Sequence, residues 1–194
     1  MLDKAIRISA KAHEGQKDKA GQPYILHPLR VMFSRKNDTE RICAVLHDII
    51  EDTDISIEYL RKESFSQEVL TALDALTKRA NESYDDFIGR VIENKIACHV
   101  KLADLLDNID LSRISNPIEE DYKRVEKYRK AVDRIFESME FDDEKYKNTK
   151  EIEISGCVSV PKDCSEDDFL NKFIDFVENN YWTFGGGIKA VDKE

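Results

Sequence analysis

The sequence has no apolar run long enough to cross a membrane. Its longest apolar stretches are only a few residues, such as 44–46, and fall far short of the ~20 that a bilayer requires. Residues 1–15 are interrupted by charge every second to fourth residue and lack the apolar core of a secretory signal. We therefore expect a cytoplasmic protein with no membrane partner.

Cysteine is scarce, and its spacing does not suit a metal-binding finger. The sequence contains no CxxC pair, and no cysteine stands at zinc-finger distance from a histidine. The four cysteines are Cys43, Cys98, Cys157 and Cys164. In a reducing cytosol we expect them to be free thiols with mostly structural roles.

An excess of basic residues is also absent. The chain has 30 Lys and Arg against 40 Asp and Glu, which gives a formal net charge of −10. Nonspecific nucleic-acid binding draws on a cationic surface, so nucleic acid is excluded as a general partner. With 41% hydrophobic and 36% charged residues, the composition is that of a soluble globular protein. The length of 194 residues suits one full domain with an appendage.

Strand-like alternation is missing from the first 140 residues, where apolar residues recur at helical spacing. Pro28 suits the first turn of a helix, and Asn37 and Ser83 are typical N-cap residues. The predicted helices cover 2–12, a segment beginning near Pro28, a segment through 42–49, 57–62, 67–78, 84–94, 96–112 and 119–139. We predict a mainly α protein in which residues 1–140 form one all-α domain.

The composition changes after this domain. Residues 141–150 are nearly all polar or charged and are predicted to be a linker. Apolar and polar residues alternate over 151–160 as in a strand, a helix is predicted after Ser165, and 182–191 is typical of a second strand. We predict a small β-α-β extension over 151–194. Such a unit is marginal alone, so we expect it to dock on the helical domain or to form a homodimer with a second copy.

The most informative stretch is LHDIIEDTD, residues 46–54. In a continuous helix, residues four apart share a face, so that His47 lies above Glu51. Asp48 lies above Asp52 for the same reason. A solvated helix end would explain the two later acids, but His47 and Asp48 lie between aliphatic residues, where an unpaired acid is costly. A metal site explains this pattern better.

A second polar face is predicted in HVKLADLLDNIDLSR. At 100° per residue, Lys101, Asp104 and Asn108 fall within an arc of roughly 60° on an otherwise apolar helix. Two interpretations remain open for this face, an internal salt bridge between Lys101 and Asp104 or a part of a functional site. The third informative segment is YILHPLRV, in which His27 directly precedes a proline. A lone histidine at such a position usually caps a helix or packs in the core.

Taken together, YILHP, LHDIIEDTD and VKLAD resemble the HD-domain phosphohydrolases. The resemblance is closest to the small alarmone hydrolases and to the (p)ppGpp hydrolase domain of the RelA/SpoT family. The loop HEGQKDKAGQPY is similar to that family's lysine-bearing loop. The resemblance covers about residues 1–135, in the family's order and spacing, and implies an HD-domain helical bundle.

The resemblance also implies roles for single residues. The residues that match the family's metal ligands are His27, His47, Asp48 and Asp104. Two imidazoles and two carboxylates suit a divalent transition ion, which is usually Mn2+ in this family. Glu51 and Asp52 match its catalytic acidic pair. In this chemistry the ion polarises a phosphoryl oxygen, while a carboxylate activates water for in-line attack on phosphorus.

Substrate contacts are expected from Lys17, Lys101, Asn108 and Tyr128. Asn108 matches a residue that contacts the ribose, Lys17 one that faces the nucleotide, and Tyr128 one that borders the pocket. Lys101 shares the polar face of Asp104.

The run after Asp104 departs from the family. Leu105, Asp107 and Asp110 are aliphatic or acidic where the RelA/SpoT pattern has Arg or His. Because cations favour an anionic substrate, we expect this departure to weaken the binding of (p)ppGpp.

Three functions follow as hypotheses. The first is a metal-dependent guanosine-3′,5′-bis(diphosphate) 3′-pyrophosphohydrolase, which the resemblance connects with the stringent response. The second is a phosphatase for another nucleotide or cofactor phosphate, and the third is a non-catalytic regulatory binding module. The acidic pair Glu51 and Asp52 favours the two enzymes, because a pure binder has no need of it.

Overall fold

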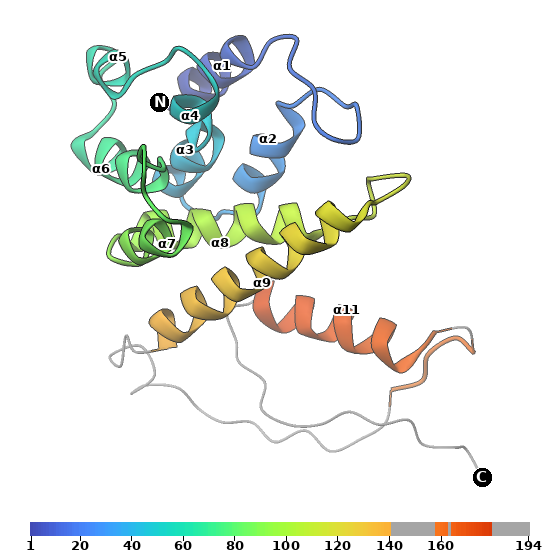
Figure 1. Cartoon of the computed structure of the whole chain (residues 1–194). Helices are drawn as coiled ribbons and strands as arrows, with labels where there is room; N and C mark the ends of the chain where they lie inside the picture. Colours follow the sequence, from blue (N-terminus) through green and yellow to red (C-terminus); the bar gives the residue numbers. More distant parts are fainter. Residues whose placement is uncertain (141–157, 163, 180–194) are drawn as a thin grey trace. The chain divides into compact units, whose positions relative to one another are not determined.

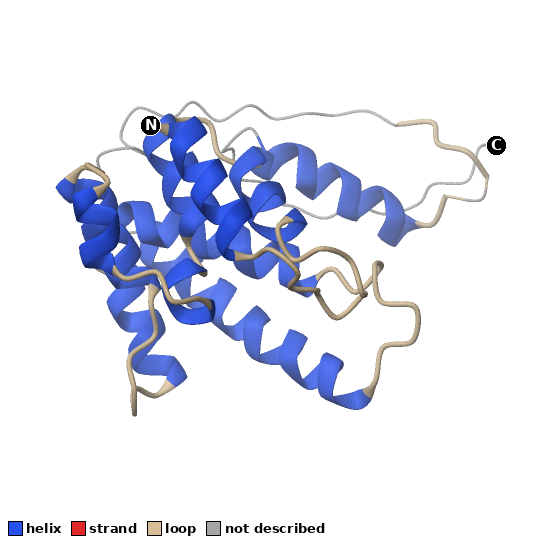
Figure 2. Ribbon diagram, turned by 90° about the horizontal axis from the view of Figure 1, so that it is seen from above, coloured by secondary structure: helices blue, strands red, loops and turns tan. Residues whose placement is uncertain are grey.

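The computed structural model describes residues 1–140, 158–162 and 164–179. The chain divides into two compact units, Met1–Asn148 and Thr149–Glu194, and each is described by itself (Figure 1). Within the described residues, helices are the only regular elements (Figure 2). None of these helices combines the length and the apolar character that a membrane span requires.

Helices are the only regular elements over residues 1–140 of the first unit, as predicted. Its helices are α1 (Leu2–Ala12), α2 (Leu26–Phe33), α3 (Asp38–Leu46), α4 (Ile49–Asp52), α5 (Ile57–Lys62), α6 (Gln67–Leu76), α7 (Tyr84–Ile92), α8 (Lys95–Ile109) and α9 (Glu119–Glu140). Short polar side chains begin several of them. Asn37 Oδ1 accepts the Glu40 N–H at 2.8 Å, and Ser83 Oγ accepts the Asp86 N–H at 3.1 Å. These bonds satisfy N–H groups that have no partner inside the helix.

Helix α8 lies at the centre of this unit. It packs against α2, α3, α6 and α7, and α9 covers it from the opposite side (Figure 1). The buried residues Val45, Leu73, Val100 and Ile135 bring α3, α6, α8 and α9 into one hydrophobic core. The buried polar residues His27, His47 and Asp104 are on or next to α2, α3 and α8, so this close-packed interior holds them in place.

The structure corrects the expected continuous helix over residues 46–54. Helix α3 ends at Leu46, α4 begins at Ile49, and His47 and Asp48 lie between the two helices. His47 Nδ1 donates to the Ala44 carbonyl at 2.7 Å, and this carbonyl is the acceptor that a continuing helix would give to the N–H of residue 48. The Asp52 N–H still donates to the Asp48 carbonyl at 2.9 Å, so these two acids keep their helical relation.

Three later helices end sooner than predicted. Helix α6 ends at Leu76, and the reason lies in α7. The Arg90 guanidinium donates to the carbonyls of Ala75 and Thr77 at 3.0 and 2.9 Å, and to Glu82. These bonds satisfy the last carbonyls of α6 without another helical turn. Helix α7 ends at Ile92, and α8 ends at Ile109.

In the second unit the structure describes one helix, α11 (Glu166–Asn179), which confirms the helix predicted after Ser165. Ser165 Oγ accepts the Asp168 N–H at 3.0 Å and begins it. The rings of Phe169 and Phe173 stack with their centroids 6.1 Å apart. Residues 158–160 of the first predicted strand are not in a strand, while 151–157 and 182–191 lie outside the described residues. The β-α-β arrangement is thus not confirmed.

Candidate metal centre and its pocket

Three side chains from distant segments meet below the surface of the first unit. His27 lies in the first turn of α2, His47 follows α3, and Asp104 lies on α8. One nitrogen or oxygen from each lies within 4.8 Å of the other two, and all three residues are buried. The carboxylate oxygen Asp104 Oδ1 is 3.1 Å from His27 Nε2 and 3.4 Å from His47 Nε2. This spacing allows all three to reach one ion.

Asp48 joins this cluster from the break between α3 and α4. Its Oδ2 lies 2.9 Å from His47 Nε2 and 3.5 Å from His27 Nε2. The structure thus brings together the four residues expected to bind metal. The charge of His47 and a hydrogen bond from His27 outweigh burial and hold the pKa of Asp48 well below its usual range.

Both imidazoles are oriented by their other ring nitrogen. His47 Nδ1 faces the Ala44 carbonyl, which can only accept, so the proton of a neutral ring sits on Nδ1. Its buried Nε2 then points a lone pair at the cluster and has no hydrogen-bond partner among the described residues. His27 is held in the same way by Asp107, whose Oδ2 is 2.7 Å from Nδ1. Outer partners of this kind commonly fix metal-binding histidines.

The electrostatic environment strongly favours a cation. Burial alone would lower the pKa of His27, but hydrogen bonds to Asp104, Asp107 and Asp48 raise it to about 11. Burial is likewise outweighed at His47, whose pKa is raised to about 9 chiefly by Asp48. A divalent ion satisfies the same carboxylates by displacing these protons. The unpartnered His47 nitrogen and the mixed imidazole and carboxylate donors therefore fit a divalent metal.

Two of the expected substrate contacts hold Asp104. Lys101 Nζ lies 2.7 Å from Asp104 Oδ2, and Asn108 Nδ2 donates to Oδ1 at 2.6 Å. The salt bridge considered for this helix face is thus present, and it includes one of the candidate metal ligands, Asp104. Lys101 and Asn108 also line the pocket over the cluster. They can therefore both orient a ligand residue and face a substrate.

Asp107, one of the acids that depart from the family pattern, is paired with basic residues in the structure. Its carboxylate accepts Arg30 Nε at 2.6 Å and Arg113 Nη2 at 3.2 Å, in addition to His27. Leu105, where the family pattern is basic, is buried in the core. Asp110 is about half exposed and lies 3.5 Å from Arg113. The run thus lacks the family's basic residues, but two of its acids lie beside arginines.

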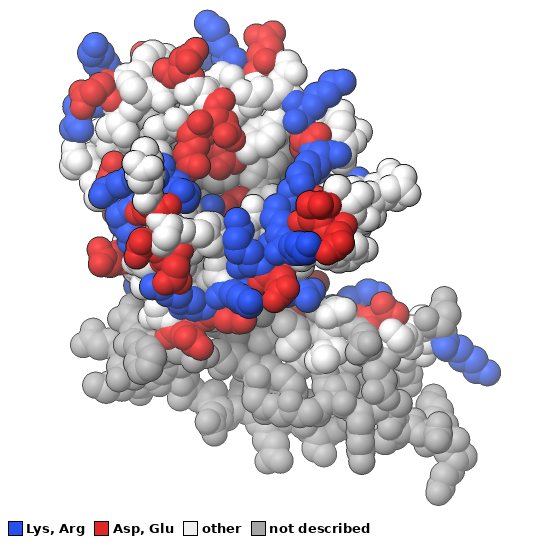
Figure 3. Space-filling model, viewed as in Figure 1, with Lys and Arg blue, Asp and Glu red and all other residues white. Residues whose placement is uncertain are grey.

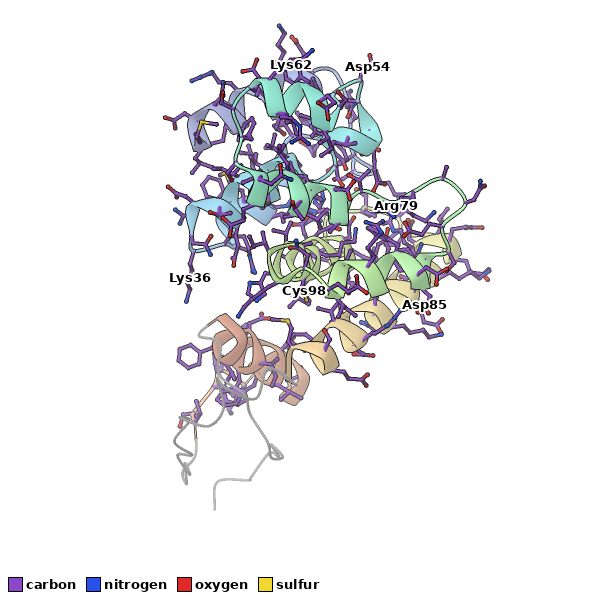
Figure 4. All side chains as sticks on the ribbon, turned by 90° about the vertical axis from the view of Figure 1, so that its left-hand side faces the viewer. Lys36, Asp54, Lys62, Arg79, Asp85 and Cys98 are labelled. Carbon is purple, nitrogen blue, oxygen red and sulfur yellow. The ribbon has the colours of Figure 1, made fainter. Side chains whose placement is uncertain are left out.

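The two expected catalytic acids occupy different positions. Glu51 lines the pocket with Asp48 and Asp104, and it accepts the backbone N–H of Lys78. Partial desolvation of its carboxylate is the main cause that raises its pKa, although the residue as a whole is exposed. Asp52 does not line this pocket, although burial and Asp48 raise its pKa as well. Asp54, the last acid of the run, is exposed at the outer edge of the unit (Figure 4).

Tyr24 is a functional candidate that the sequence did not single out. Its hydroxyl donates to Asp48 Oδ2 at 2.6 Å and lies 3.2 Å from Asp52 Oδ2. Burial, followed by the charge of Asp48, raises the pKa of this hydroxyl, which therefore stays protonated. Tyr24 begins the YILHP motif, three residues before His27, and that placement is the signal that could have found it.

Two pockets open beside the cluster and share Tyr24 and Asn108 in their walls. The larger has a volume of about 340 Å³ and is lined by Asp48, Glu51, Lys78, Tyr84, Phe87, Lys101, Asp104, Lys127 and Tyr128 as well. The smaller, of about 220 Å³, contains Lys17, another expected substrate contact, and His27. On the face drawn in Figure 3, acidic and basic side chains are interspersed. The pockets thus combine cations for a phosphate with carboxylates for a metal.

No protein-family model matches the chain. A guanosine-3′,5′-bis(diphosphate) 3′-pyrophosphohydrolase of Aquifex aeolicus is 34% identical over 120 residues, which cover 56% of this chain and 17% of the relative. Its counterpart in Borreliella burgdorferi is 34% identical over 122 residues, which cover 55% and 18%. The chain thus spans less than a fifth of the length of these curated relatives.

A solved structure shares the fold. This is the structure of a metazoan ortholog of SpoT that hydrolyses ppGpp. Its comparison with this chain gives a TM-score of 0.53 and 24% sequence identity, and the match covers 71% of this chain and 94% of the metazoan chain. In sequence and helical fold, this chain therefore resembles the ppGpp 3′-pyrophosphohydrolases of the SpoT/RelA family.

Proposed function

We propose that this chain is a metal-dependent hydrolase that releases pyrophosphate from the 3′ position of guanosine-3′,5′-bis(diphosphate). The observation that carries the proposal is the convergence of His27, His47, Asp48 and Asp104 beside a pocket. Asp48, Asp104 and Glu51 line this pocket. The relatives named for this activity support the choice of substrate.

In this proposal the four converging residues hold one divalent ion. When bound, the ion supplies Lewis acidity toward a phosphoryl oxygen and toward water. Manganese is our choice because the donor set of two imidazoles and two carboxylates suits a divalent transition ion. Lys101 and Asn108 keep Asp104 directed at the two imidazoles, and Tyr24 holds Asp48 through its hydroxyl.

Glu51 is proposed as the general base. Its raised pKa, caused mainly by partial desolvation, brings the carboxylate closer to the range in which a base accepts a proton efficiently. The Lys78 N–H fixes one carboxylate oxygen, so that the other is left for the attacking water. Lys101, Asn108 and Tyr128, which line the same pocket, are proposed to face the substrate, together with Lys17 from the smaller pocket. Asp52, which contacts Tyr24, is proposed to support the acidic pair.

The test is to incubate the purified chain with ppGpp and Mn2+ and to measure pyrophosphate and orthophosphate separately. We expect pyrophosphate that disappears on chelation of the metal. Glu51→Gln should lower turnover by about 10²- to 10⁴-fold while the bound metal is kept. Release of orthophosphate alone would favour a phosphatase for another nucleotide or cofactor. Bound metal without turnover on a nucleotide panel would favour a regulatory binding module.

The role of the C-terminal part is also a proposal. We keep the division into a hydrolase domain over 1–140, a linker over 141–150 and a small α+β extension over 151–194, and we propose that the extension forms a homodimer. Truncation near residue 145, followed by measurement of the mass in solution, tests this. The free thiols of Cys43, Cys98 and Cys164 agree with action in the reducing cytoplasm, where we place a role in the stringent response.

A further inference from the structure

We propose that His13 and Gln16 are positioning residues for the hydrolysis, because together they hold the short helix α4 that carries the acidic pair. The inference rests on the proposed function, since it names what keeps Glu51 and Asp52 in place for that reaction. His13 and Gln16 belong to the run HEGQ, which directly follows α1. Neither residue lines either pocket, so both act on the reaction through other residues.

Helix α4 is too short to be stable by itself. It has four residues, Ile49–Asp52, and therefore only about one turn. An isolated turn of helix is unfavourable, because several backbone dihedral angles are fixed for few hydrogen bonds. The backbone N–H of Lys78 holds the Glu51 carboxylate. The end of the helix at Asp52 needs a second support.

Gln16 supplies this support from the far side of the chain. Its side-chain Nε2 donates to the backbone carbonyl of Asp52 at 3.1 Å, across 36 positions of the sequence. The last carbonyls of a helix have no partner inside the helix, so the amide satisfies an acceptor that α4 leaves open. The Tyr24 hydroxyl cannot take over this role, because its single hydrogen is given to Asp48. The position of Asp52 therefore depends on Gln16.

His13 fixes the orientation of the Gln16 amide. Because a carbonyl can only accept, the amide nitrogen must face Asp52, and the amide oxygen then faces His13. His13 Nδ1 lies 2.8 Å from Gln16 Oε1, so Nδ1 is the donor of this bond and carries the proton of a neutral ring. The other ring nitrogen, Nε2, is buried and has no hydrogen-bond partner among the described residues. The hydrogen bond that this imidazole makes thus directs Gln16 to α4.

The backbone around Gln16 is shaped for this contact. Gly15 has a φ of 80°, a left-handed conformation that favours glycine. After this turn the Gln16 N–H donates to the His13 carbonyl at 3.1 Å, and the Gln16 carbonyl accepts the Tyr24 N–H at 2.9 Å. The rings of His13 and Tyr24 also pack together, with centroids 4.9 Å apart, and His13 is only 3% exposed. Gln16 is therefore fixed by His13 on one side and by Tyr24 on the other.

The kinetics of Gln16→Met test the role of this contact in the reaction. Methionine keeps the length of the side chain but has no amide, so the bond to the Asp52 carbonyl is lost. With saturating Mn2+, kcat for pyrophosphate release from ppGpp should fall about tenfold, whereas KM and the dissociation constant for Mn2+ should change by less than about twofold. Gln67→Met is the matched control, because both amide atoms of Gln67 are also bonded, to Arg61 and Thr71. A wild-type kcat in Gln16→Met would overturn the inference and leave the proposed function standing.

Two variants of His13 separate its hydrogen bond from its packing. His13→Asn places an amide nitrogen where Nδ1 lies and keeps the donor, whereas His13→Phe keeps a ring against Tyr24 and removes the donor. We expect kcat to fall about tenfold in His13→Phe and by no more than about threefold in His13→Asn. His13→Phe combined with Gln16→Met should lose no more than Gln16→Met alone, because both changes break one connection. The opposite order of the two His13 variants would refute the role of the hydrogen bond.

Hydrogen exchange tests the same connection without turnover. Mass spectrometry of the backbone amides in 49–53 should show exchange about tenfold faster in folded Gln16→Met than in wild type or in Gln67→Met. Exchange at the wild-type rate in Gln16→Met would overturn the inference. If the wild-type chain releases no pyrophosphate from ppGpp, the proposed function fails, whereas faster exchange in Gln16→Met still shows that Gln16 holds α4.

Discussion

Asp107 offers the sharpest test of how the metal centre is held. Replacing it with alanine removes the acceptor that lies 2.7 Å from His27 Nδ1 and leaves this ring nitrogen without the bond that aims Nε2 at the cluster. A hydrogen bond to a charged group contributes roughly 1.5–3 kcal/mol. Since each 1.4 kcal/mol is about a tenfold change, the dissociation constant for Mn2+ should rise about 10- to 100-fold.

The assay is calorimetric titration of Mn2+ into the metal-free protein at neutral pH. Asp107→Asn should show a smaller loss than Asp107→Ala, because the amide oxygen can still accept from His27. Asp110→Asn is the matched control, since Asp110 also faces Arg113 but makes no contact with His27. Circular dichroism shows whether each variant keeps its helices. If folded Asp107→Ala binds Mn2+ as tightly as the wild type does, the proposed orientation of His27 is refuted.

Three further predictions concern other parts of the first unit. Tyr24→Phe should weaken Mn2+ binding by about tenfold, because Asp48 loses a hydroxyl donor at 2.6 Å; an unchanged affinity in calorimetry would contradict this. Arg90 lowers the pKa of Glu82 from 4.5 to about 2, so this carboxylate stabilises the fold above pH 4.5 and less as the pH falls toward 2. Glu82→Gln should therefore lower Tm at neutral pH, and the difference in Tm from wild type should shrink as the pH falls from 4.5 toward 2. A difference in Tm that does not depend on pH would argue against the ion pair. Ile135→Ala, at a fully buried position where α9 joins the core, should lower the free energy of unfolding in urea by about 2–5 kcal/mol, whereas a loss well below this range would mean that α9 is loosely packed.

The helical architecture could be predicted because it depends mainly on local signals. The helix predicted over 57–62 coincides with α5, which Ser56 caps at its N-terminus. Leu60 is the buried residue of this helix. The break after Leu46 could not be predicted in this way. It depends on the hydrogen bond between the His47 side chain and the Ala44 carbonyl, which replaces a backbone bond of the helix. The periodicity of apolar residues carries no information about this hydrogen bond.

The candidate site shows the same division. The resemblance to the HD-domain phosphohydrolases implied that His27, His47, Asp48 and Asp104 would converge, and the structure brings them together. Two partners of Asp107, His27 and Arg30, were not foreseeable, because they lie 80 and 77 positions away in the chain. A charge that looks unfavourable within its own helix can thus be neutralised by residues that only the tertiary fold brings near.

The convergence of α2, the α3–α4 break and α8 on one cluster also concerns the cell's supply of metal. An unfolded chain cannot hold these side chains together, so an ion that binds the cluster stabilises only the folded form. At a free concentration one hundred times its dissociation constant, such an ion would add about 2.7 kcal/mol to the free energy of unfolding. Metal starvation would then lower both the fraction of sites that hold an ion and the amount of folded protein. The abundance of the protein would therefore respond to the supply of metal.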